Sequence, residues 1–523
     1  MSVRDWVSIC DLPEILPDTG VCALVDGRQI ALFRMSDIRM GDALYAIDNR
    51  DPMSGANVLS RGIVGDVRGE LVVASPLYKH HYSLTTGRCL EDPDKFVNVY
   101  PAKVVDGRVC VNIGTHQPLR AAKRRRLVVI GNGMAGMRTV EELLTLAPNA
   151  YEIVVFGAEP HGNYNRILLS PVLAGEKKVE DIVLNSPEWY EQHGVTLHAG
   201  DPVVSIDRRK RVVKSKRGVE LSYDRLLLAT GSQPIMLPIP GVELPGVITF
   251  RDLADVEAML AAAKRGRKAV VIGGGLLGLE AANGLLSRGM AVTVVHLFDT
   301  LMERQLDAAA AALLRASLVS RGIQFRMPAQ TTALIGSESV TAVRFSDGSE
   351  IPADLVVMAV GVRPNIALAG EAGLHCDRGI LVNDTLQTYD PSVYAVGECV
   401  QHRNVTFGLV APLWEQARVC ATHLAELGLS RYRGTLLATQ LKVTGIELYS
   451  AGDFRDSEHT EDIVLRDPGR QVYKRLVIRD NKLRGAVLFG DASAGPWYFE
   501  MIAAGRDVAD IRNELLFGPA PGS

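Results

Sequence analysis

Residues 127–136 read LVVIGNGMAG, an apolar run that passes directly into a glycine-rich turn. Its three glycines, Gly131, Gly133 and Gly136, have the G-x-G-x-x-G spacing of a dinucleotide-binding turn. The first permits a tight turn, the second lets the backbone approach a pyrophosphate, and the third lets a helix pack closely on its strand. The stretch therefore predicts a β-strand, a phosphate-binding turn and the N-terminus of an α-helix.

The sequence that follows completes the pattern of a first nucleotide-binding half. We expect a helix over residues 134–146, because Pro148 lies just beyond the point where such a helix ends. Residues 151–156 form a second apolar run, which predicts a strand. Glu159 comes shortly after it, where a carboxylate can accept hydrogen bonds from the ribose hydroxyls of a nucleotide.

A second copy of this pattern follows later in the chain. The turn lies in AVVIGGGLLG (269–278), and we expect a helix over 276–288 and a strand over 291–295. The position expected to hold the ribose-binding acid carries His296 instead. Asp299 is close enough to replace that acid, or is simply a solvated loop residue. Since neither a carboxylate nor an arginine stands at the expected position, we predict only a slight preference for NADH over NADPH.

The composition is ordinary for a globular protein of several domains. The chain has 523 residues, 47% of them hydrophobic and 22% charged, which predicts three or four domains. Its net charge of −3 argues against nucleic acid or an anionic membrane as a partner. No apolar run reaches the ~18 residues of a transmembrane helix, and residues 1–11 lack the apolar core of a signal peptide. We therefore expect a cytoplasmic protein, whose seven cysteines have no metal-binding spacing.

Both ends of the chain differ in pattern from the two nucleotide-binding halves. Turns at Asp26-Gly27 and Asp106-Gly107, between short apolar runs, predict β-hairpins in an all-β N-terminal domain. The basic run at residues 123–126 is interpreted as part of a solvated linker rather than a binding patch. Near the C-terminus we expect a strand over 472–478 and a final helix near 508–516.

The fold class is therefore predicted as α/β together with β: an all-β domain, two tandem Rossmann-like domains and a smaller α+β domain. The expected boundaries are 1–114 for the all-β domain, 115–126 for the linker, 127–245 and 362–424 for two parts of the first nucleotide-binding domain, 246–361 for the second such domain, and 425–523 for the C-terminal domain.

Two nucleotide sites in tandem indicate two cofactors between which electrons pass. A reduced nicotinamide donates a hydride, a flavin accepts it, and the protein holds the two reacting rings together. That transfer requires no acid–base residue, and the sequence has no Ser/His/Asp or Cys/His constellation that indicates one. We therefore assign no catalytic residue and no metal ligand.

Two further motifs carry a resemblance to a known family. The turn Ala-Thr-Gly at 229–231 lies between the two fingerprints, and the stretch YAVGE at 394–398 follows them. This order resembles that of the two-dinucleotide flavoprotein reductases, which include rubredoxin and ferredoxin reductases. The resemblance implies FAD on the first half and NAD(P)H on the second. It also implies that Glu398 hydrogen-bonds the ribityl chain of FAD. Related ferredoxin reductases often carry a lysine at the place of Pro171, so any role of that lysine is absent here.

A closer resemblance extends from the first fingerprint almost to the C-terminus. The stretches NYNRILLS (163–170), FGLVAP (407–412) and GAVLFGD (485–491) are similar to the N-terminal part of the large subunit of assimilatory NAD(P)H nitrite reductases. The resemblance implies that Arg166 lies beside the isoalloxazine. It also implies that the helix after Pro412 points its positive N-terminus at the flavin.

Residues 1–114 resemble the small subunit of the same enzymes, which has a Rieske-like fold without the iron–sulfur cluster. In a true Rieske centre two Cys and two His hold the cluster. The four corresponding positions carry Asp51, Met53, Ser75 and Tyr78. These side chains cannot jointly hold a cluster, and His80 and His81, as neighbours on a strand, would point to opposite sides. We therefore expect neither an iron–sulfur cluster nor sirohaem in this chain.

The resemblances imply an FAD-dependent NAD(P)H oxidoreductase that passes electrons to a separate nitrite or nitrate reductase subunit. That partner would carry an iron–sulfur and sirohaem centre, or a molybdenum centre, because this sequence contains no cysteine-rich module that could bind one. Two alternatives remain open. One is a ferredoxin- or rubredoxin-type reductase of another pathway, and the other is a redox sensor or scaffold in which the flavin sets the conformation.

The candidate cofactor-binding residues all lie in these motifs or next to them. They are Gly131, Gly133, Met134, Ala135, Gly136, Glu159, Arg166, Ala229, Thr230, Gly231, Gly397 and Glu398 for FAD, and Gly273, Gly275, Leu276, Gly278, Glu280, His296 and Gly361 for NAD(P)H.

Overall fold

The chain forms two compact units. The first unit comprises Met1–Arg124 with Glu426–Gly428, and the second comprises Arg125–Ala425 with Leu429–Ser523. The computed structural model describes residues 6–36, 43–67, 69–92, 94–114, 124–428, 430–441, 443–455 and 459–519. Most of the predicted linker, residues 115–123, lies outside the described residues.

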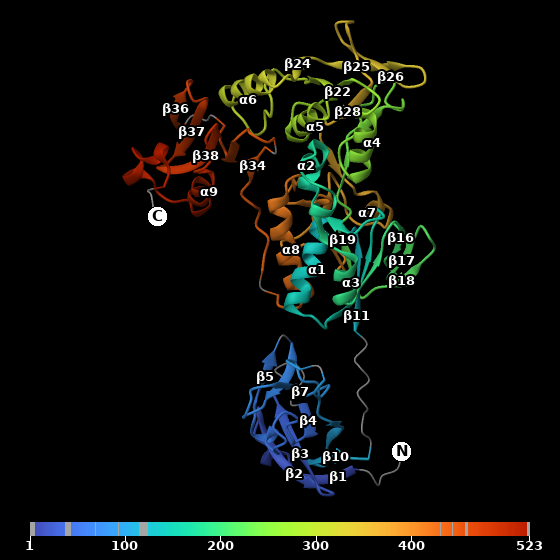
Figure 1. Cartoon of the computed structure of the whole chain (residues 1–523). Coiled ribbons are helices and arrows are strands. Elements are labelled where there is room, and N and C mark those ends of the chain that lie inside the picture. Colours follow the sequence, from blue (N-terminus) through green and yellow to red (C-terminus); the bar gives the residue numbers. More distant parts are fainter. Residues whose placement is uncertain are drawn as a thin grey trace. The chain divides into compact units, whose positions relative to one another are not determined.

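The N-terminal unit is an all-β structure in its described residues (Figure 1). Two of its sheets have three strands and one has four. They are β1 (Trp6–Asp11) with β10 (Arg108–Asn112) and β9 (Ala102–Val105); β2 (Thr19–Val25) with β3 (Arg28–Met35), β4 (Ala43–Asp48) and β8 (Val99–Tyr100); and β5 (Ile63–Val67) with β6 (Glu70–Ala74) and β7 (His81–Ser83). Every pairing within these sheets is antiparallel.

Both predicted hairpins of this unit are confirmed. Asp26 and Gly27 join β2 to β3 with φ values of 47° and 76°, and Asp106 and Gly107 join β9 to β10 with 50° and 79°. Positive φ at both central residues is the turn geometry whose twist matches that of the flanking strands.

The second unit contains two parallel five-stranded sheets, which correspond to the two predicted nucleotide-binding halves (Figure 1). The first sheet has the order β15 (Val195–His198), β12 (Tyr151–Phe156), β11 (Arg125–Ile130), β19 (Arg225–Leu228), β31 (Val393–Ala395). The second has the order β21 (Val247–Thr249), β28 (Leu355–Met358), β22 (Lys268–Ile272), β23 (Ala291–Val295), β24 (Gln324–Arg326).

Each half carries the same additions to its sheet. A three-stranded antiparallel meander belongs to each: β16 (Val203–Asp207), β17 (Val212–Ser215) and β18 (Glu220–Ser222) in the first half, and β25 (Thr331–Gly336), β26 (Val340–Phe345) and β27 (Glu350–Pro352) in the second. The main helices are α1 (Met134–Leu146), α2 (Leu169–Ala174), α3 (Pro187–Gln192) and α8 (Val410–Leu424) in the first half, and α4 (Leu253–Ala263), α5 (Leu276–Ser287) and α6 (Ala308–Ser320) in the second. The two halves are joined by the antiparallel pair β20 (Ser232–Pro234) and β29 (Val362–Pro364).

The C-terminal part of this unit is an antiparallel sheet with one longer helix. Its strand order is β34 (Ala438–Gln440), β35 (Leu448–Gly452), β38 (Lys482–Phe489), β37 (Val472–Arg479), β36 (Glu461–Asp467), and α9 (Gly495–Ala504) packs on it. One hydrophobic cluster includes Leu448 and Phe489 of this sheet, Leu314 of α6 and Leu173 of α2. The C-terminal sheet therefore shares a core with the second nucleotide half and with α2 of the first.

Two expectations for local structure are wrong. No regular helix covers residues 508–516, where the described chain has only two short 3-10 turns, Ala509–Ile511 and Leu515–Phe517. The backbone N–H of Val508 donates to Asn481, so this segment is held against the β37–β38 turn instead of closing a helix. In addition, Arg126 belongs to β11, and its Nη2 donates to both carboxylate oxygens of Glu152. The last residue of the basic run is therefore part of the sheet and not of a solvated linker.

A buried ion pair fastens the C-terminal sheet to the second nucleotide half. Arg475 of β37 lies 3.4 Å from Asp307, the N-cap of α6, and their side chains are 9% and 11% exposed. We expect Arg475→Ala to lower the free energy of unfolding by about 3 kcal/mol, because it leaves a buried carboxylate without its cation. Denaturation by urea would measure this. Arg470→Ala is the control, since Arg470 is 85% exposed beside Asp467 and should change the value by less than about 0.5 kcal/mol.

Candidate functional site

The first glycine-rich turn is fixed by a close approach of two backbone segments. Gly131 has a φ of 112°, and a Cβ there would collide with the carbonyl oxygen of Ala229. A Cβ on Gly136 would lie 2.7 Å from the carbonyl oxygen of Gly131. A Cβ on Gly133 would instead meet open space, at the N-cap of α1. The first and third glycines therefore hold the turn against its neighbours, and the second marks the side open to a ligand.

The second fingerprint repeats these contacts. A Cβ on Gly273, whose φ is 127°, would collide with the carbonyl oxygen of Ala359, and one on Gly278 would collide with that of Gly273. A Cβ on Gly275, the N-cap of α5, again meets open space. The two halves are thus duplicates in the geometry of the turn as well as in sequence.

A cleft of about 600 Å³ opens above the first fingerprint. The candidate residues that line it are Gly131, Gly133, Met134, Ala135, Glu159, Arg166, Ala229, Thr230, Gly231, Leu276, Glu280, Gly397 and Glu398. Leu409 and Val410, at the N-terminus of α8, also line it, so this helix begins at the cleft, two residues before Pro412. The residues present fit a dinucleotide, because the open face at Gly133 and the N-terminal N–H groups of α1 lie in one wall.

The cleft is shared by both nucleotide halves. Leu276, Leu277 and Glu280 of the first turns of α5 line it together with the first fingerprint. Residues 438–440 of β34 form a further part of its wall. A molecule that enters along the second half therefore reaches the same space as one that lies along the first half.

Both predicted ligand carboxylates in the cleft are paired with arginines. Glu159 forms an ion pair with Arg166 and accepts a hydrogen bond of 2.7 Å from the Tyr164 hydroxyl. Glu398 forms an ion pair with Arg251 and accepts one of 2.8 Å from Ser232. The guanidinium groups offset the charge of these two carboxylates, while Asp252 and Glu280 also line the cleft.

Arg251 is a cleft residue that sequence reasoning missed. It follows β21 at the start of the second half and contacts Glu398 of the first half, and its backbone carbonyl accepts a hydrogen bond of 3.1 Å from Arg166. Asp255 fixes the same segment by accepting from the Arg251 N–H, and burial raises the pKa of Asp255. An arginine two residues after a short strand was the only signal in the sequence, and it carries no motif.

Tyr164 and Arg166 perturb each other's ionisation. Burial and the adjacent Glu159 raise the pKa of Tyr164, although the Arg166 cation opposes this shift. Burial alone would lower the pKa of Arg166, but Tyr164 and Glu159 outweigh it and raise that pKa. Arg166 therefore stays a cation, and Tyr164 stays a neutral hydrogen-bond donor, at any physiological pH.

Glu280 connects the two halves at the cleft. Its carboxylate accepts a hydrogen bond of 2.5 Å from Ser170 of α2, and both residues are 4% exposed. The contact lies one residue before Pro171, where related reductases often carry lysine. In this chain a serine hydroxyl therefore bridges the first half to α5.

The remaining candidate residues do not line the cleft. They are Gly136, Gly273, Gly275, Gly278, His296 and Gly361. His296 is 8% exposed, and its Nδ1 accepts a hydrogen bond of 3.0 Å from the backbone N–H of Gly274. The ring therefore packs under the second glycine-rich turn.

The strand registers allow the two halves to be compared at the position expected for the ribose-binding acid. Ile130 pairs with Phe156, and Ile272 pairs with Val295. Glu159 is the third residue after its strand, and the third residue after β23 is Phe298, not His296. Phe298 lies closer to the last glycine of its turn than Glu159 does, because the helix, the connection and the strand are each one residue shorter in the second half.

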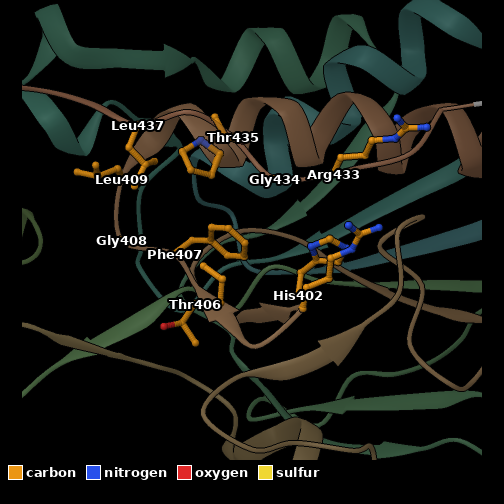
Figure 2. A pocket seen from close by; sticks show the side chains of 12 residues that line it. His402, Thr406, Phe407, Gly408, Leu409, Arg433, Gly434, Thr435 and Leu437 are labelled. Atoms are coloured by element: carbon orange, nitrogen blue, oxygen red, sulfur yellow. The ribbon is translucent and has the colours of Figure 1, made fainter. Parts of the chain in front are cut away.

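A second, smaller hollow of about 200 Å³ lies next to the cleft (Figure 2). It shares Gly408 and Leu409 with the cleft. Figure 2 shows the Phe407 ring between the His402 side chain and the segment that carries Thr435. Ligand pockets usually occupy roughly 300–1,000 Å³, so this hollow suits one side chain better than a cofactor.

Two of the four positions that correspond to the ligands of a Rieske centre, Asp51 and Ser75, are hydrogen-bonded to each other in the N-terminal unit. Asp51 is fully buried and accepts hydrogen bonds from the Ser75 hydroxyl at 2.7 Å and the Tyr82 hydroxyl at 2.8 Å. Burial alone would raise the pKa of Asp51, but hydrogen bonds from Ser75, the Met53 N–H, Tyr82 and Ser54 outweigh it and lower that pKa. The side chains of Met53 and Tyr78 are open to solvent, at 38% and 61% exposed. These residues do not fit an iron–sulfur cluster.

The described residues hold neither a metal-ligand cluster nor a membrane-spanning helix. No three His, Cys, Asp or Glu side chains in them gather as ligands for a metal ion. None of the helices in the described part of the chain is long and apolar enough to cross a membrane.

The fold and the shared cleft define a two-nucleotide oxidoreductase, and comparison with known families agrees. Residues 125–422 match the pyridine nucleotide-disulphide oxidoreductase family, residues 5–112 match a Rieske-like [2Fe-2S] domain, and residues 438–506 match the rubredoxin NAD+ reductase C-terminal domain. The chain belongs to the pyridine nucleotide-disulphide oxidoreductase family, whose members are flavin- and NAD(P)H-binding oxidoreductases.

Individual relatives are similar over three quarters of the chain. It is 50% identical over 396 residues to nitrite reductase [NAD(P)H] of Bacillus subtilis strain 168, which covers 76% of this chain and 49% of the relative. It is 45% identical over 394 residues to the assimilatory nitrate reductase electron transfer subunit of the same strain, with 75% and 51% covered. The chain thus spans about half the length of these two relatives. Among solved structures, the ferredoxin reductase for the CYP199A2 system of Rhodopseudomonas palustris has a TM-score of 0.67, with 25% identity over 75% of this chain and 99% of that one.

The two middle glycines offer a matched pair of variants that separates the nucleotide sites. Gly133 and Gly275 have φ values of −90° and −82°, so alanine fits the backbone at both. We expect Gly133→Ala to weaken FAD binding roughly tenfold, because its methyl group crowds the pyrophosphate. Gly275→Ala should weaken NAD+ binding by a similar factor and leave the FAD content unchanged.

Titrations of FAD into the apoprotein and of NAD+ into the holoprotein would measure both effects. The thermal midpoint of each variant should stay within ~2 °C of the parent, because neither methyl group contacts the protein. Loss of both nucleotides in either variant would contradict the assignment of one fingerprint to each.

Proposed function

We propose that this chain is an FAD-dependent NAD(P)H oxidoreductase that feeds electrons to a separate nitrite or nitrate reductase subunit. The observation that carries the proposal is the shared cleft, in whose wall the first fingerprint and the first turns of α5 lie together. FAD, when bound, accepts a hydride from NAD(P)H and passes electrons on singly or in pairs. The protein's part is to hold the two reacting rings in one space from which water is excluded.

Each wall of the cleft has a role in this proposal. The N-terminus of α1 binds the pyrophosphate of FAD, and Glu159 and Glu398 accept hydrogen bonds from its ribose and ribityl hydroxyls. Arg166 and Arg251 orient these two carboxylates through the ion pairs that they make with them. Leu276 and Glu280, from the second half, close the face against which the nicotinamide lies.

We propose that the N-terminal unit carries no iron–sulfur cluster, although its family is that of Rieske-like [2Fe-2S] domains. The support is Asp51, whose carboxylate takes four hydrogen bonds and links the two loops that a cluster would otherwise join. A shaped surface without redox chemistry suits docking of the electron-accepting partner.

An analysis of iron tests this part. Protein purified under anaerobic conditions should contain one FAD per chain, with iron and acid-labile sulfide at background. The visible spectrum should show flavin bands alone. Stoichiometric iron together with a Rieske-type electron-spin-resonance signal would show that the loops around Asp51 rearrange to hold a cluster.

The partner is proposed from the names and chemistry of the relatives. One relative is an electron transfer subunit of an assimilatory nitrate reductase, and another is a nitrite reductase [NAD(P)H]. We therefore propose a partner with an iron–sulfur and sirohaem centre or a molybdenum centre. A cytoplasmic location is supported by the seven cysteines, all of them in described residues and none of them in a disulfide.

The decisive experiment is an anaerobic assay of the isolated chain. NADH should bleach the flavin, and ferricyanide or a dye should then be reduced in steady turnover. Nitrite should give no ammonium, because that reduction takes six electrons and the proposed cofactor content includes no metal centre on which to collect them. Sustained formation of ammonium by the chain alone would overturn the proposal that its partner is separate.

The same assay separates the two alternatives. A redox sensor or scaffold would bleach once and show no steady turnover with dye. A ferredoxin- or rubredoxin-type reductase would reduce ferredoxin or rubredoxin faster than it supports a nitrite or nitrate reductase subunit. Removal of residues 1–114 should spare dye reduction and weaken transfer to the partner, whereas a purely stabilising N-terminal unit would lower both activities together.

A further inference from the structure

The second nucleotide half lacks an acid in the position of Glu159. Phe298 stands there, in a described part of the chain, and its side chain is 51% exposed next to Leu297, which is 55% exposed. These two apolar side chains beyond the end of β23 offer no acceptor to a ribose hydroxyl. The acceptor must therefore come from another part of the sequence.

The structure supplies a carboxylate through His296. The ring accepts a hydrogen bond on Nδ1 from the Gly274 N–H, so the proton of the neutral imidazole is on Nε2. Nε2 lies 3.2 Å from a carboxylate oxygen of Glu303 and 3.2 Å from the Thr300 carbonyl oxygen. The His296 ring therefore connects Glu303 to the glycine-rich turn through its two nitrogen atoms. Its side chain is 34% exposed, so it is both fixed and accessible.

Arg326, on the strand next to β23, contacts residues other than Glu303. Arg326, at the end of β24, is engaged by Asp347 at 2.5 Å and by the Ser349 hydroxyl at 2.7 Å. Asp299, the acid suggested by the sequence, accepts a hydrogen bond from the neighbouring Thr300 hydroxyl. A phosphate near the ribose would thus be repelled by the negative charge of Glu303, and Arg326 on β24 is already paired with Asp347.

We propose that Glu303, positioned by His296, is the residue that selects NADH over NADPH. Its carboxylate accepts a hydrogen bond from the ribose hydroxyl of NADH. It repels the extra phosphate of NADPH, which carries between one and two negative charges at neutral pH. The inference rests on the proposed function, since it requires that the second fingerprint bind the nicotinamide nucleotide.

The experiment measures binding rather than turnover. NAD+ and NADP+ are titrated by calorimetry into the FAD-loaded, full-length protein, because the oxidised nucleotides bind without reducing the flavin. The parent should bind NAD+ more tightly. Glu303→Gln keeps the shape of the side chain and removes its charge, so NADP+ should bind roughly fivefold more tightly while NAD+ changes less than about twofold. The gain for NADP+ should shrink as salt is raised.

Two further variants serve as controls. Asp299→Asn removes a neighbouring exposed charge that accepts a hydrogen bond from Thr300 rather than from His296, and it should leave the ratio of the two dissociation constants unchanged. Glu303→Asp retains the charge and should keep the preference for NAD+. FAD content and thermal midpoint should match the parent in all three variants, which shows that the second half remains folded.

The outcomes separate this inference from the function on which it rests. If the parent binds neither nucleotide, the proposed function falls and the inference falls with it. If the parent binds both but Glu303→Gln leaves their ratio unchanged, only the assignment of Glu303 is overturned. The same holds if Asp299→Asn shifts the ratio as much as Glu303→Gln does, because the effect would then be one of overall charge.

Discussion

A backbone carbonyl pressed against a glycine, once in each nucleotide half, is the contact on which the rest of the site depends. Ala229 meets Gly131 in the first half, and Ala359 meets Gly273 in the second, at distances that leave no room for a Cβ. Because these turns can close so tightly, α1 and α5 begin directly at the edge of their sheets. The N–H groups at each helix N-terminus then face the ligand side. A side chain at either glycine would move the helix and open the turn.

The two halves work as one site because several contacts hold them together. The pair β20–β29 carries the chain between them, and Arg251 reaches across to Glu398. Ser170 bridges to Glu280, and the surrounding hydrophobic cluster includes parts of α2, α5 and the C-terminal sheet. The C-terminal sheet therefore contributes to the mutual position of the two nucleotide sites, in addition to forming part of the wall of the cleft.

In the N-terminal unit a buried carboxylate connects two loops by hydrogen bonds. A cluster with four ligands would cross-link two loops covalently, whereas Asp51 links them through hydrogen bonds from Ser75 and Tyr82. A buried carboxylate is costly unless it is fully hydrogen-bonded, and these donors, with Met53 and Ser54, meet that need. This arrangement favours a docking or structural role over electron transfer within the unit, which agrees with the proposal of a separate acceptor.

The sequence by itself determined both glycine-rich turns, their flanking strands and helices, the two hairpins of the N-terminal unit and the family, because each is indicated by a short run of residues with a characteristic spacing along the chain. It failed for residues 508–516, where a contact with Asn481 replaced the expected helix. The tertiary structure alone revealed Arg251 in the cleft and Glu303 behind His296. These side chains meet partners across a domain boundary or around a loop, and no local pattern of residues encodes such a meeting. The sequence alone suggested His296 as a ribose-binding residue, and only the tertiary structure placed its ring beneath the glycine-rich turn, where it contacts the carboxylate of Glu303.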